Sequence, residues 1–271
     1  MSEKIAFIGA GNMASALVHG LLKDGYAADQ LVASDPASER REALAGSGVH
    51  TTDDNQQAID GAAVVVLAVK PQIMETVCED IQAAIAQCKP VVISIAAGIS
   101  ESSLQKWLGD DIAIVRTMPN TPAMLQAGAT VLHANACVSE SQRDLAESVM
   151  RAVGITRWLE QESQIDAATA LSGSGPAYFF LIIEALEEAG IELGLPAETA
   201  HLLTLQTALG AARMAMESPE SASQLRTRVT SPGGTTEAAI EHMQNAKLPA
   251  ILAEAMRKAH ERSIELSKTR D

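Results

Sequence analysis

Three short segments of this chain combine glycine or proline with hydroxyl and amide side chains, a composition suited to binding small ligands. They are MPNTPA at 118–123, LSGSGPAY at 171–178 and SPGGTT at 231–236. The third is the most informative, because its two glycines precede an expected helix and leave room for a carboxylate near the unpaired first amides. Each segment also has a purely structural interpretation. MPNTPA could be a proline-stiffened turn, LSGSGPAY a capped connector between domains, and SPGGTT a simple capping turn. We expect a small-anion site at 231–236.

A fourth segment, near residue 10, predicts a dinucleotide site. An apolar run at 5–8 enters a glycine turn and a segment of helical period leaves it, which gives G-x-G-x-x-A between a strand and a helix. Gly9 permits the tight turn, Gly11 leaves space for a pyrophosphate, and Ala14 lets the helix pack closely on the strand. The motif stands at the start of a long α/β pattern, which favours nucleotide binding over an ordinary glycine-rich turn.

The elements that position these segments alternate between strands and helices as far as residue 162. Valine-rich apolar runs such as 62–69 are typical of parallel strands buried on both faces. Expected strands are 5–8, 30–35, a short one near 49, 62–69, 90–95, 112–117, 130–133 and 156–158. Expected helices are 13–18, 38–45, 73–87, 100–107 and 140–152. The alternation predicts an α/β domain with a mostly parallel, doubly wound sheet and its ligand at the carboxyl ends of the strands.

The pattern changes after residue 163, where long helical stretches broken by glycine and proline replace the strands. Helices are expected at 176–193, 196–217, 235–244 and 249–268. The first of these is apolar around most of its circumference, which indicates burial on all sides. A helical domain of this size has little room for such a helix, so we expect a second copy of the chain to cover it.

Charge and composition argue against several classes of protein. A formal net charge of −14 at pH 7 argues against nucleic acid as a partner, because phosphate backbones require a basic face. We see no apolar run near the ~20 residues that span a membrane, and no secretory signal pattern. The three cysteines are odd in number and too far apart for a zinc site, so they indicate reduced thiols and no metal. We expect a soluble cytoplasmic protein.

Taken together, these segments resemble the pyrroline-5-carboxylate reductase family along the whole chain. The motifs that carry the resemblance are IGAGNMA at 8–14, AVKP at 68–71, SIAAG at 94–98, and MPNTPA, SGSGPAY and SPGGTT. Each alone is weak, but the set in this order and spacing is highly specific. The resemblance implies reduction of 1-pyrroline-5-carboxylate to L-proline by a nicotinamide cofactor, the last step of proline synthesis. It also implies a Rossmann domain, 1–162, and an all-helical substrate-binding and dimerisation domain, 163–271, in a homodimer or an assembly of dimers.

The same resemblance implies which residues bind each ligand. For the substrate these are Ser231, Gly233, Gly234, Thr235 and Thr236. Thr236 is expected to bond the ring nitrogen, and Ser174 is the second candidate for a catalytic hydroxyl. For the dinucleotide the expected residues are Gly9, Ala10, Gly11, Asn12, Met13, Ser34, Arg40, Asn55, Ala68, Val69, Lys70, Ala96, Ala97 and Asn120.

The residues after the second expected strand leave the cofactor open between NADPH and NADH. Asp35 ends that strand, where an acid often binds the ribose hydroxyls of NAD. Ser34 precedes it, and Arg40 and Arg41 follow within one helical turn, which suits the 2′-phosphate of NADP instead. The family commonly uses NADPH, so we expect NADPH to be preferred, with NADH as a second cofactor.

Two other functions are compatible with parts of the sequence. A β-hydroxyacid dehydrogenase is similar in its glycine turn and two-domain plan, but it usually carries a catalytic lysine on the first long helix of its second domain. No lysine occurs between Lys106 and Lys247 in this chain. A non-catalytic sensor would bind NAD(P) with the same fold. The SPGGTT segment favours an enzyme, because a sensor has no need of a second small-anion site.

Overall fold

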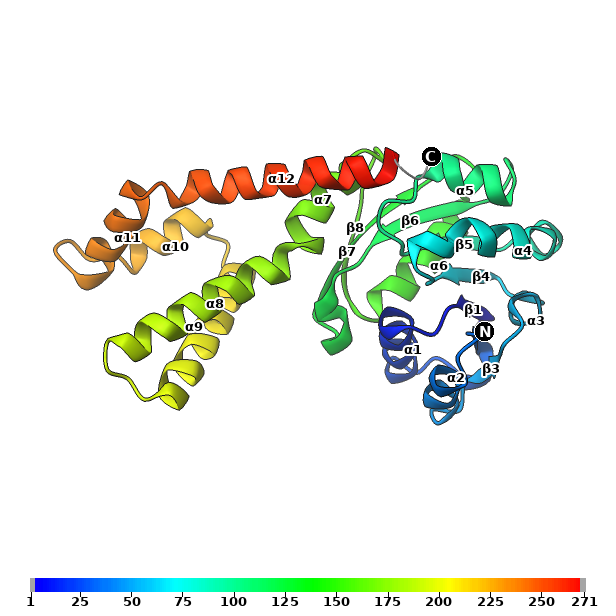
Figure 1. The fold of residues 1–271 in the computed structure, drawn as a ribbon, viewed down its shortest axis with the longest axis horizontal. Helices are drawn as coiled ribbons and strands as arrows, with labels where there is room; N and C mark the ends of the chain where they lie inside the picture. The colour runs from blue at the N-terminus through cyan, green and yellow to red at the C-terminus, as the bar shows by residue number, and fades with distance from the viewer. Residues whose placement is uncertain (1–2, 269–271) are drawn as a thin grey trace. The chain divides into compact units, whose positions relative to one another are not determined.

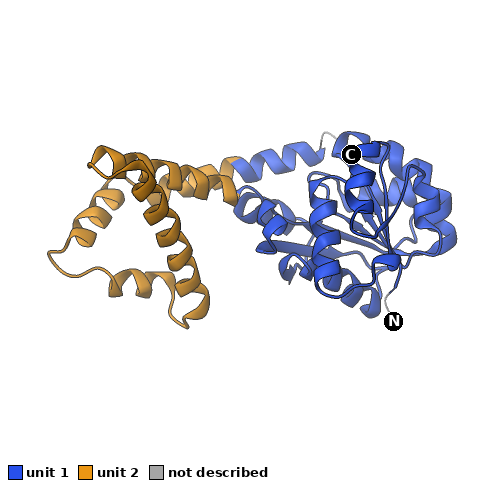
Figure 2. Ribbon diagram, turned by 90° about the horizontal axis from the view of Figure 1, so that it is seen from below, with its two compact units in different colours: residues 1–174, 259–271 blue, residues 175–258 orange. Residues whose placement is uncertain are grey.

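The chain folds into two compact units, which we describe separately (Figure 2). The computed structural model describes residues 3–268. One unit comprises residues 1–174 with 259–271, and the other comprises residues 175–258. The first unit extends beyond residue 162, where we expected the domain boundary, because the short helix after that residue packs on two strands of the sheet.

The first unit is built on one eight-stranded sheet with the order β3-β2-β1-β4-β5-β6-β7-β8 (Figure 1). The strands are β1 Ile5–Ile8, β2 Leu31–Ser34, β3 His50–Thr52, β4 Val64–Leu67, β5 Val91–Ser94, β6 Ile114–Met118, β7 Gly128–Ala134 and β8 Gly154–Trp158. Neighbouring strands are parallel except β6 and β7. Residues 119–127 connect that pair, fewer than the dozen or more that a parallel crossover needs. The expected mostly parallel, doubly wound sheet is confirmed, and its order reverses between β1 and β4.

Helices cover both faces of this sheet (Figure 1). One face packs on α1 Asn12–Lys23, α2 Ser38–Ala45 and α6 Glu140–Arg151; the other packs on α3 Asn55–Ile59, α4 Met74–Cys88 and α5 Glu101–Leu108. Alternate strand residues supply the two cores: Phe7 belongs to the first and Ile8 to the second. Because both faces are covered, the inner strands are apolar throughout, which is why they were recognisable in the sequence.

Short helices account for most differences between expected and observed elements. The structure adds α3, α10 Ala222–Arg228 and the 3-10 helices η1 Ala28–Gln30, η2 Pro71–Ile73 and η3 Thr121–Leu125. α3 has five residues and is held by its N-cap, where the Asp54 carboxylate accepts hydrogen bonds from the amides of Gln56 and Gln57. A helix this short shows no helical period, so its cap was the one signal that could have indicated it.

The segment 171–178 is helical and is neither a ligand-binding loop nor a capped connector. A continuous helical stretch runs through it, made of α7 Gln164–Ala168, a π-helical turn η4 Thr169–Gly173, and α8 Gly175–Glu192. The amide of Ser174 donates to the carbonyl of Thr169 at 2.8 Å. This donor is therefore satisfied within a widened helical turn, which also accommodates the glycines.

The second unit is made of helices with apolar surfaces. It contains α8, α9 Ala197–Glu217, α10, α11 Thr235–Asn245 and the first part of α12 Leu248–Lys268. α8 and α9 pack together where Gly190 approaches Ala200. Phe179, Phe180 and Leu181 on α8 each remain 66% exposed. The helix expected to be buried on all sides is thus largely uncovered by the residues described in a single chain.

One helical stretch of the described residues, Gln164–Glu192, is long and apolar enough to cross a membrane, contrary to the expectation from the sequence. Only 11% of its most apolar part is buried. Length and composition do not distinguish a membrane span from a helix that another protein surface covers.

Candidate functional site

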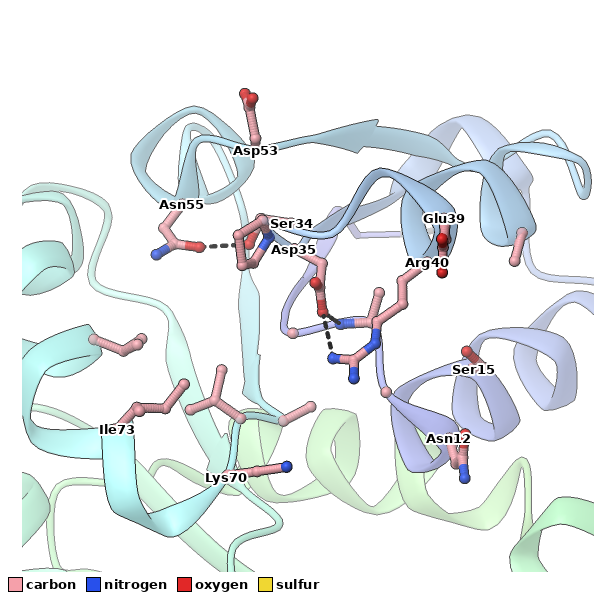
Figure 3. A pocket seen from close by; sticks show the side chains of 18 residues that line it. Asn12, Ser15, Ser34, Asp35, Glu39, Arg40, Asp53, Asn55, Lys70 and Ile73 are labelled. Carbon is pink, nitrogen blue, oxygen red and sulfur yellow. Dashed lines mark hydrogen bonds and ion pairs between the residues drawn. The ribbon is translucent and has the colours of Figure 1, made fainter.

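A pocket of about 760 Å³ lies at the carboxyl ends of β1, β2 and β4, where the strand order reverses (Figure 3). Open α/β sheets bind ligands in this crevice. Most residues expected at the dinucleotide line it, namely Gly9, Ala10, Gly11, Asn12, Ser34, Arg40, Asn55, Ala68, Val69 and Lys70. The structure adds residues outside that expected set: Ser15, Asp35, Pro36, Glu39, Ala43, Asp53, Ile73 and Val77.

Helical spacing explains several of these additional residues. Glu39 and Ala43 are four residues apart on α2, and Ile73 and Val77 are four apart where η2 enters α4. Residues four apart share one face of a helix. The loops before α2 and α4 were already assigned to the site. Helical periodicity from those loops could therefore have predicted which face of each helix lines the pocket.

Close backbone contacts fix the glycine turn between β1 and α1. Gly9 has φ +97°, a left-handed conformation that favours glycine, and its amide donates to the carbonyl of Ser34 at 2.8 Å. A β-carbon on Gly9 would lie 2.8 Å from the carbonyl oxygen of Ala68. The fold itself therefore requires glycine here, where the chain leaves β1 between its two neighbouring strands.

In contrast to Gly9, Gly11 has free space around the position of a β-carbon. A β-carbon on Gly11 would meet no described heavy atom within 4 Å, and the residue has an ordinary φ of −74°. No side chain caps α1, and its first turn contains no acidic residue. The first amides of a helix lack intrahelical partners and lie at the positive end of its dipole. The space at Gly11 therefore suits a pyrophosphate, in agreement with the motif.

Ser34, Asn55 and Arg40 form the part of the pocket at the end of β2. Ser34 Oγ donates to Asn55 Oδ1 at 2.7 Å, and Asn55 Nδ2 donates to Asp80 Oδ2 at 3.3 Å. The side chain of Arg40, on α2, is 54% exposed. This end of the pocket thus combines a hydroxyl, an amide and an accessible guanidinium, the groups that commonly bind a phosphate monoester.

The Asp35 carboxylate is almost entirely buried in the wall of the pocket, with 3% of its side chain exposed. Its Oδ2 accepts hydrogen bonds from the Ala10 amide at 2.9 Å and from Arg40 Nη1 at 3.3 Å. Its Oδ1 accepts from the Ala37 amide at 2.9 Å. Burial acts to raise the pKa of this carboxyl, but the two amides and Arg40 outweigh burial and hold the pKa below its ordinary value. Asp35 is therefore ionised at neutral pH.

The remaining residues expected at the dinucleotide lie outside the lining of this pocket: Met13, Ala96, Ala97 and Asn120. Met13 packs against the apolar core, and Ala96 is buried. The Asn120 amide nitrogen donates to the carbonyl of Ser172 at 3.0 Å, and its oxygen accepts from the Ala129 amide at 2.9 Å. These four remain predicted cofactor contacts, and Asn120 has in addition a structural task between η4 and β7.

The SPGGTT segment, in the second unit, opens α11 as expected. Gly233 has φ +73°, and Gly234 is the N-cap of the helix without a side-chain capping bond. The Gly233 amide donates to Glu237 Oε2 at 2.6 Å, and the Gly234 amide donates to the carbonyl of Ser231 at 3.0 Å. Both glycine amides are thus engaged, and the donors left for an anion are the amides of the first helical turn.

The described residues contain no group of three or more histidine, cysteine, aspartate or glutamate side chains placed to hold a metal ion. Cys78, Cys88 and Cys137 are free thiols. Burial on α4 raises the pKa of Cys78 to about 12, so this residue stays protonated at neutral pH. A buried thiol of this kind packs as a small apolar side chain and is a poor nucleophile.

Models of known families match both parts of the chain. Residues 162–266 match the family described as pyrroline-5-carboxylate reductase dimerisation. Residues 4–98 match the family described as NADP oxidoreductase, coenzyme F420-dependent. The second match contains the glycine turn and the strands at the pocket, and the first contains the SPGGTT segment.

Individual relatives extend along the whole chain. A pyrroline-5-carboxylate reductase of Pseudomonas aeruginosa is 51% identical over 268 residues, which is 98% of each chain. The structure of a pyrroline-5-carboxylate reductase from Coxiella burnetii superposes with a TM-score of 0.95 at 49% identity and covers 98% of this chain and 99% of its own. A pyrroline carboxylate reductase from Plasmodium falciparum, solved with NADP bound, has a TM-score of 0.87 at 29% identity over 98% of each chain.

The two glycines of the turn should give separable defects when each is replaced by alanine. Gly9→Ala should lower the free energy of unfolding by about 3 kcal/mol, because the methyl group meets the backbone at Ala68 in a strained conformation. Gly11→Ala should change that free energy by less than about 0.5 kcal/mol. It should nevertheless weaken NADPH binding roughly tenfold, since a clash of about 1.4 kcal/mol with the pyrophosphate suffices.

Urea unfolding and fluorescence titration with NADPH measure the two effects on the same preparations. Gly11→Ala is the control for Gly9→Ala in the unfolding experiment. Parent-like NADPH affinity in Gly11→Ala would show that no pyrophosphate approaches this turn.

Proposed function

This chain belongs to the pyrroline-5-carboxylate reductase family, and we propose that it reduces 1-pyrroline-5-carboxylate to L-proline, the last step of proline biosynthesis. The observation that carries the proposal is 51% identity to such an enzyme over 98% of both chains. The pocket at the glycine turn supports it, because oxidoreductases of this fold bind their nicotinamide dinucleotide there. The protein is an NAD(P)-dependent oxidoreductase that acts on a carbon–nitrogen bond.

The reaction adds a hydride to the imine carbon and a proton to the ring nitrogen, and the dinucleotide supplies the hydride when it is bound. The imine can be protonated by solvent, so no strongly basic side chain is needed. In agreement with this, the sequence has no lysine between Lys106 and Lys247. The protein then contributes mainly by holding both ligands in a reactive arrangement and by stabilising charge.

We assign the substrate to the segment that begins α11, with Ser231, Gly233, Gly234, Thr235 and Thr236 as its contacts. The first amides of the helix hold the carboxylate, at the positive end of the helix dipole. The Glu237 carboxylate holds the Gly233 amide and so keeps the turn in shape. The Thr236 hydroxyl bonds the ring nitrogen, and Ser174 is the second candidate for that role.

We assign the dinucleotide to the pocket of the first unit, with NADPH preferred and NADH accepted. Space at Gly11 and the uncapped start of α1 support pyrophosphate binding there. The exposed Arg40 guanidinium beside Ser34 supports recognition of a 2′-phosphate. The relative from Plasmodium falciparum was solved with NADP bound, which also supports NADP as the cofactor.

We assign the working form as a cytoplasmic homodimer, either alone or as the repeating unit of a larger assembly. Residues 162–266 match a family described as a dimerisation family, and α8 exposes large apolar side chains in the single chain. A second copy would remove this apolar surface from water, which stabilises an association by roughly 25 cal/mol per Å². Burial against a second copy also explains why the stretch Gln164–Glu192 is apolar, without requiring that it cross a membrane.

Purified full-length protein should consume NADPH only when 1-pyrroline-5-carboxylate is present and should release an equal amount of L-proline. The fall in NADPH absorbance measures the cofactor consumed, and amino-acid analysis measures the L-proline released; 3-hydroxy acids with NADP+ serve as control substrates. Oxidation of a 3-hydroxy acid would favour the β-hydroxyacid dehydrogenase alternative. Tight NADPH binding with no turnover of the imine would favour a sensor.

Thr236→Ala should lower the turnover number by about tenfold or more, because a hydrogen bond to a charged group contributes roughly 1.5–3 kcal/mol. A bond that strengthens as the nitrogen becomes an amine lowers the barrier, rather than only the Michaelis constant. NADPH affinity should stay within twofold of the parent, about 0.4 kcal/mol, and Thr236→Ser should recover most of the turnover. Steady-state kinetics and NADPH titration check both points. Unchanged turnover in Thr236→Ala would move the assignment to Ser231 or Ser174.

Phe180→Asp should dissociate the dimer and abolish activity together, because it places a charge on the apolar surface of α8. Leu125→Asp is the matched control, since Leu125 is 84% exposed on η3 in the other unit. It should keep both the assembly and the activity. Light scattering at micromolar concentration measures the assembly, and a fully active monomer of the parent protein would contradict the prediction.

A further inference from the structure

The Asp35 side chain joins three parts of the dinucleotide pocket (Figure 3). It accepts hydrogen bonds from the Ala10 amide in the glycine turn, 25 positions earlier, from the Ala37 amide before α2, and from Arg40 on α2. The distances are 2.9, 2.9 and 3.3 Å. One carboxylate therefore connects the turn expected at the pyrophosphate to the arginine expected at the 2′-phosphate.

An acid that binds ribose hydroxyls must present an oxygen to the ligand, and Asp35 does not. Its side chain is 3% exposed, and each of its oxygens accepts from a backbone amide. Turning the carboxylate towards a ribose would leave the Ala10 amide without its acceptor, which is costly for a buried donor. The carboxylate is instead held in place by its own hydrogen bonds.

The neighbouring charges leave Arg40 as the accessible cation at this end of the pocket. Arg41 Nη1 donates to the carbonyl of Asp35 at 2.6 Å, and Arg41 lies 4.0 Å from the Asp53 carboxylate. Its side chain is 23% exposed, compared with 54% for Arg40. Arg41 thus holds the backbone of the strand end, whereas Arg40 lines the pocket with more than half of its side chain exposed.

We propose that Asp35 is a positioning residue that fixes the glycine turn and holds Arg40, and that it does not select NADH through its ribose. The inference rests on the proposed cofactor site and deepens it. The glycine turn serves the pyrophosphate that NADPH and NADH share, so Asp35 supports the binding of both cofactors, and it supports NADPH additionally by holding Arg40. Arg40 distinguishes them, because it meets the 2′-phosphate that NADH lacks. The pairing with Arg40 and the two amides also explains how an acid at this position is compatible with a phosphorylated ribose.

The test is to titrate NADPH and NADH separately into the purified full-length protein and its variants. Asp35→Ala should raise the NADH dissociation constant about tenfold, because the shared turn is loosened, and the NADPH constant by at least as much, because Arg40 also loses its partner. Asp35→Asn, which keeps one acceptor oxygen, should recover part of the loss for both. Arg40→Ala should raise the NADPH constant about tenfold and leave the NADH constant within twofold. Glu42→Gln controls for removal of one negative charge on α2 and should change neither.

The kinetic pattern separates positioning from a direct or a general structural role. Turnover in Asp35→Asn at saturating NADPH should stay within twofold of the parent, while the Michaelis constants for both cofactors rise together. A loss confined to NADH, or tighter NADPH binding in either Asp35 variant, would identify Asp35 as a ribose-binding acid and overturn the proposal.

Hydrogen exchange gives a second measurement that needs no cofactor. The Ala10 amide should be protected in the parent protein and should exchange at least about tenfold faster in Asp35→Ala, as expected for a lost hydrogen bond. An Ala10 amide that exchanges in the parent as fast as an exposed amide would overturn the proposal. If the parent protein bound no dinucleotide, the proposed function would be contradicted. The exchange rate of the Ala10 amide would then still test whether Asp35 fixes the glycine turn.

Discussion

The structure of the first unit depends on one close approach of backbone, where the chain leaves β1 and passes Ala68. A single extra carbon on Gly9 would lie 2.8 Å from a carbonyl oxygen, and the φ of +97° suits glycine alone. This turn also lies where the strand order reverses, so the crevice for a ligand opens beside it. The same short segment therefore closes the sheet and shapes the pocket, with Gly9 serving the fold and Gly11 leaving space for the ligand.

A protein with a net charge of −14 needs local devices to hold an anionic cofactor. The pocket supplies them through helix amides at the start of α1 and through Arg40, rather than through a broad basic surface. Ser34 and Asn55 add polar groups at the same end. The acidic Asp35 is compatible with this arrangement because its charge is directed towards two amides and Arg40.

The stability of the second unit has a different basis, because its helices bury little of their apolar surface within one chain. Phe179, Phe180 and Leu181 are each 66% exposed, although helices of this composition are ordinarily buried. In the homodimer that we propose, a second copy would cover that surface, consistent with the match of residues 162–266 to a family described as a dimerisation family. The SPGGTT turn is carried by this unit, so substrate binding as we propose it depends on the same assembly.

The sequence by itself determined the elements whose signals are local. The strands around β4, the long helices and the glycine turn follow from apolar periodicity, from helix caps and from the G-x-G-x-x-A spacing at 9–14. Tertiary structure alone decided features that join distant residues. These include the contact of Ser34 with Asn55, the bond from the Asn120 side chain to the carbonyl of Ser172, and the bond from the Ala10 amide to Asp35. The physical reason is that periodicity records which face of an element is apolar, whereas a side chain between two loops finds its partner only when the sheet brings the loops together.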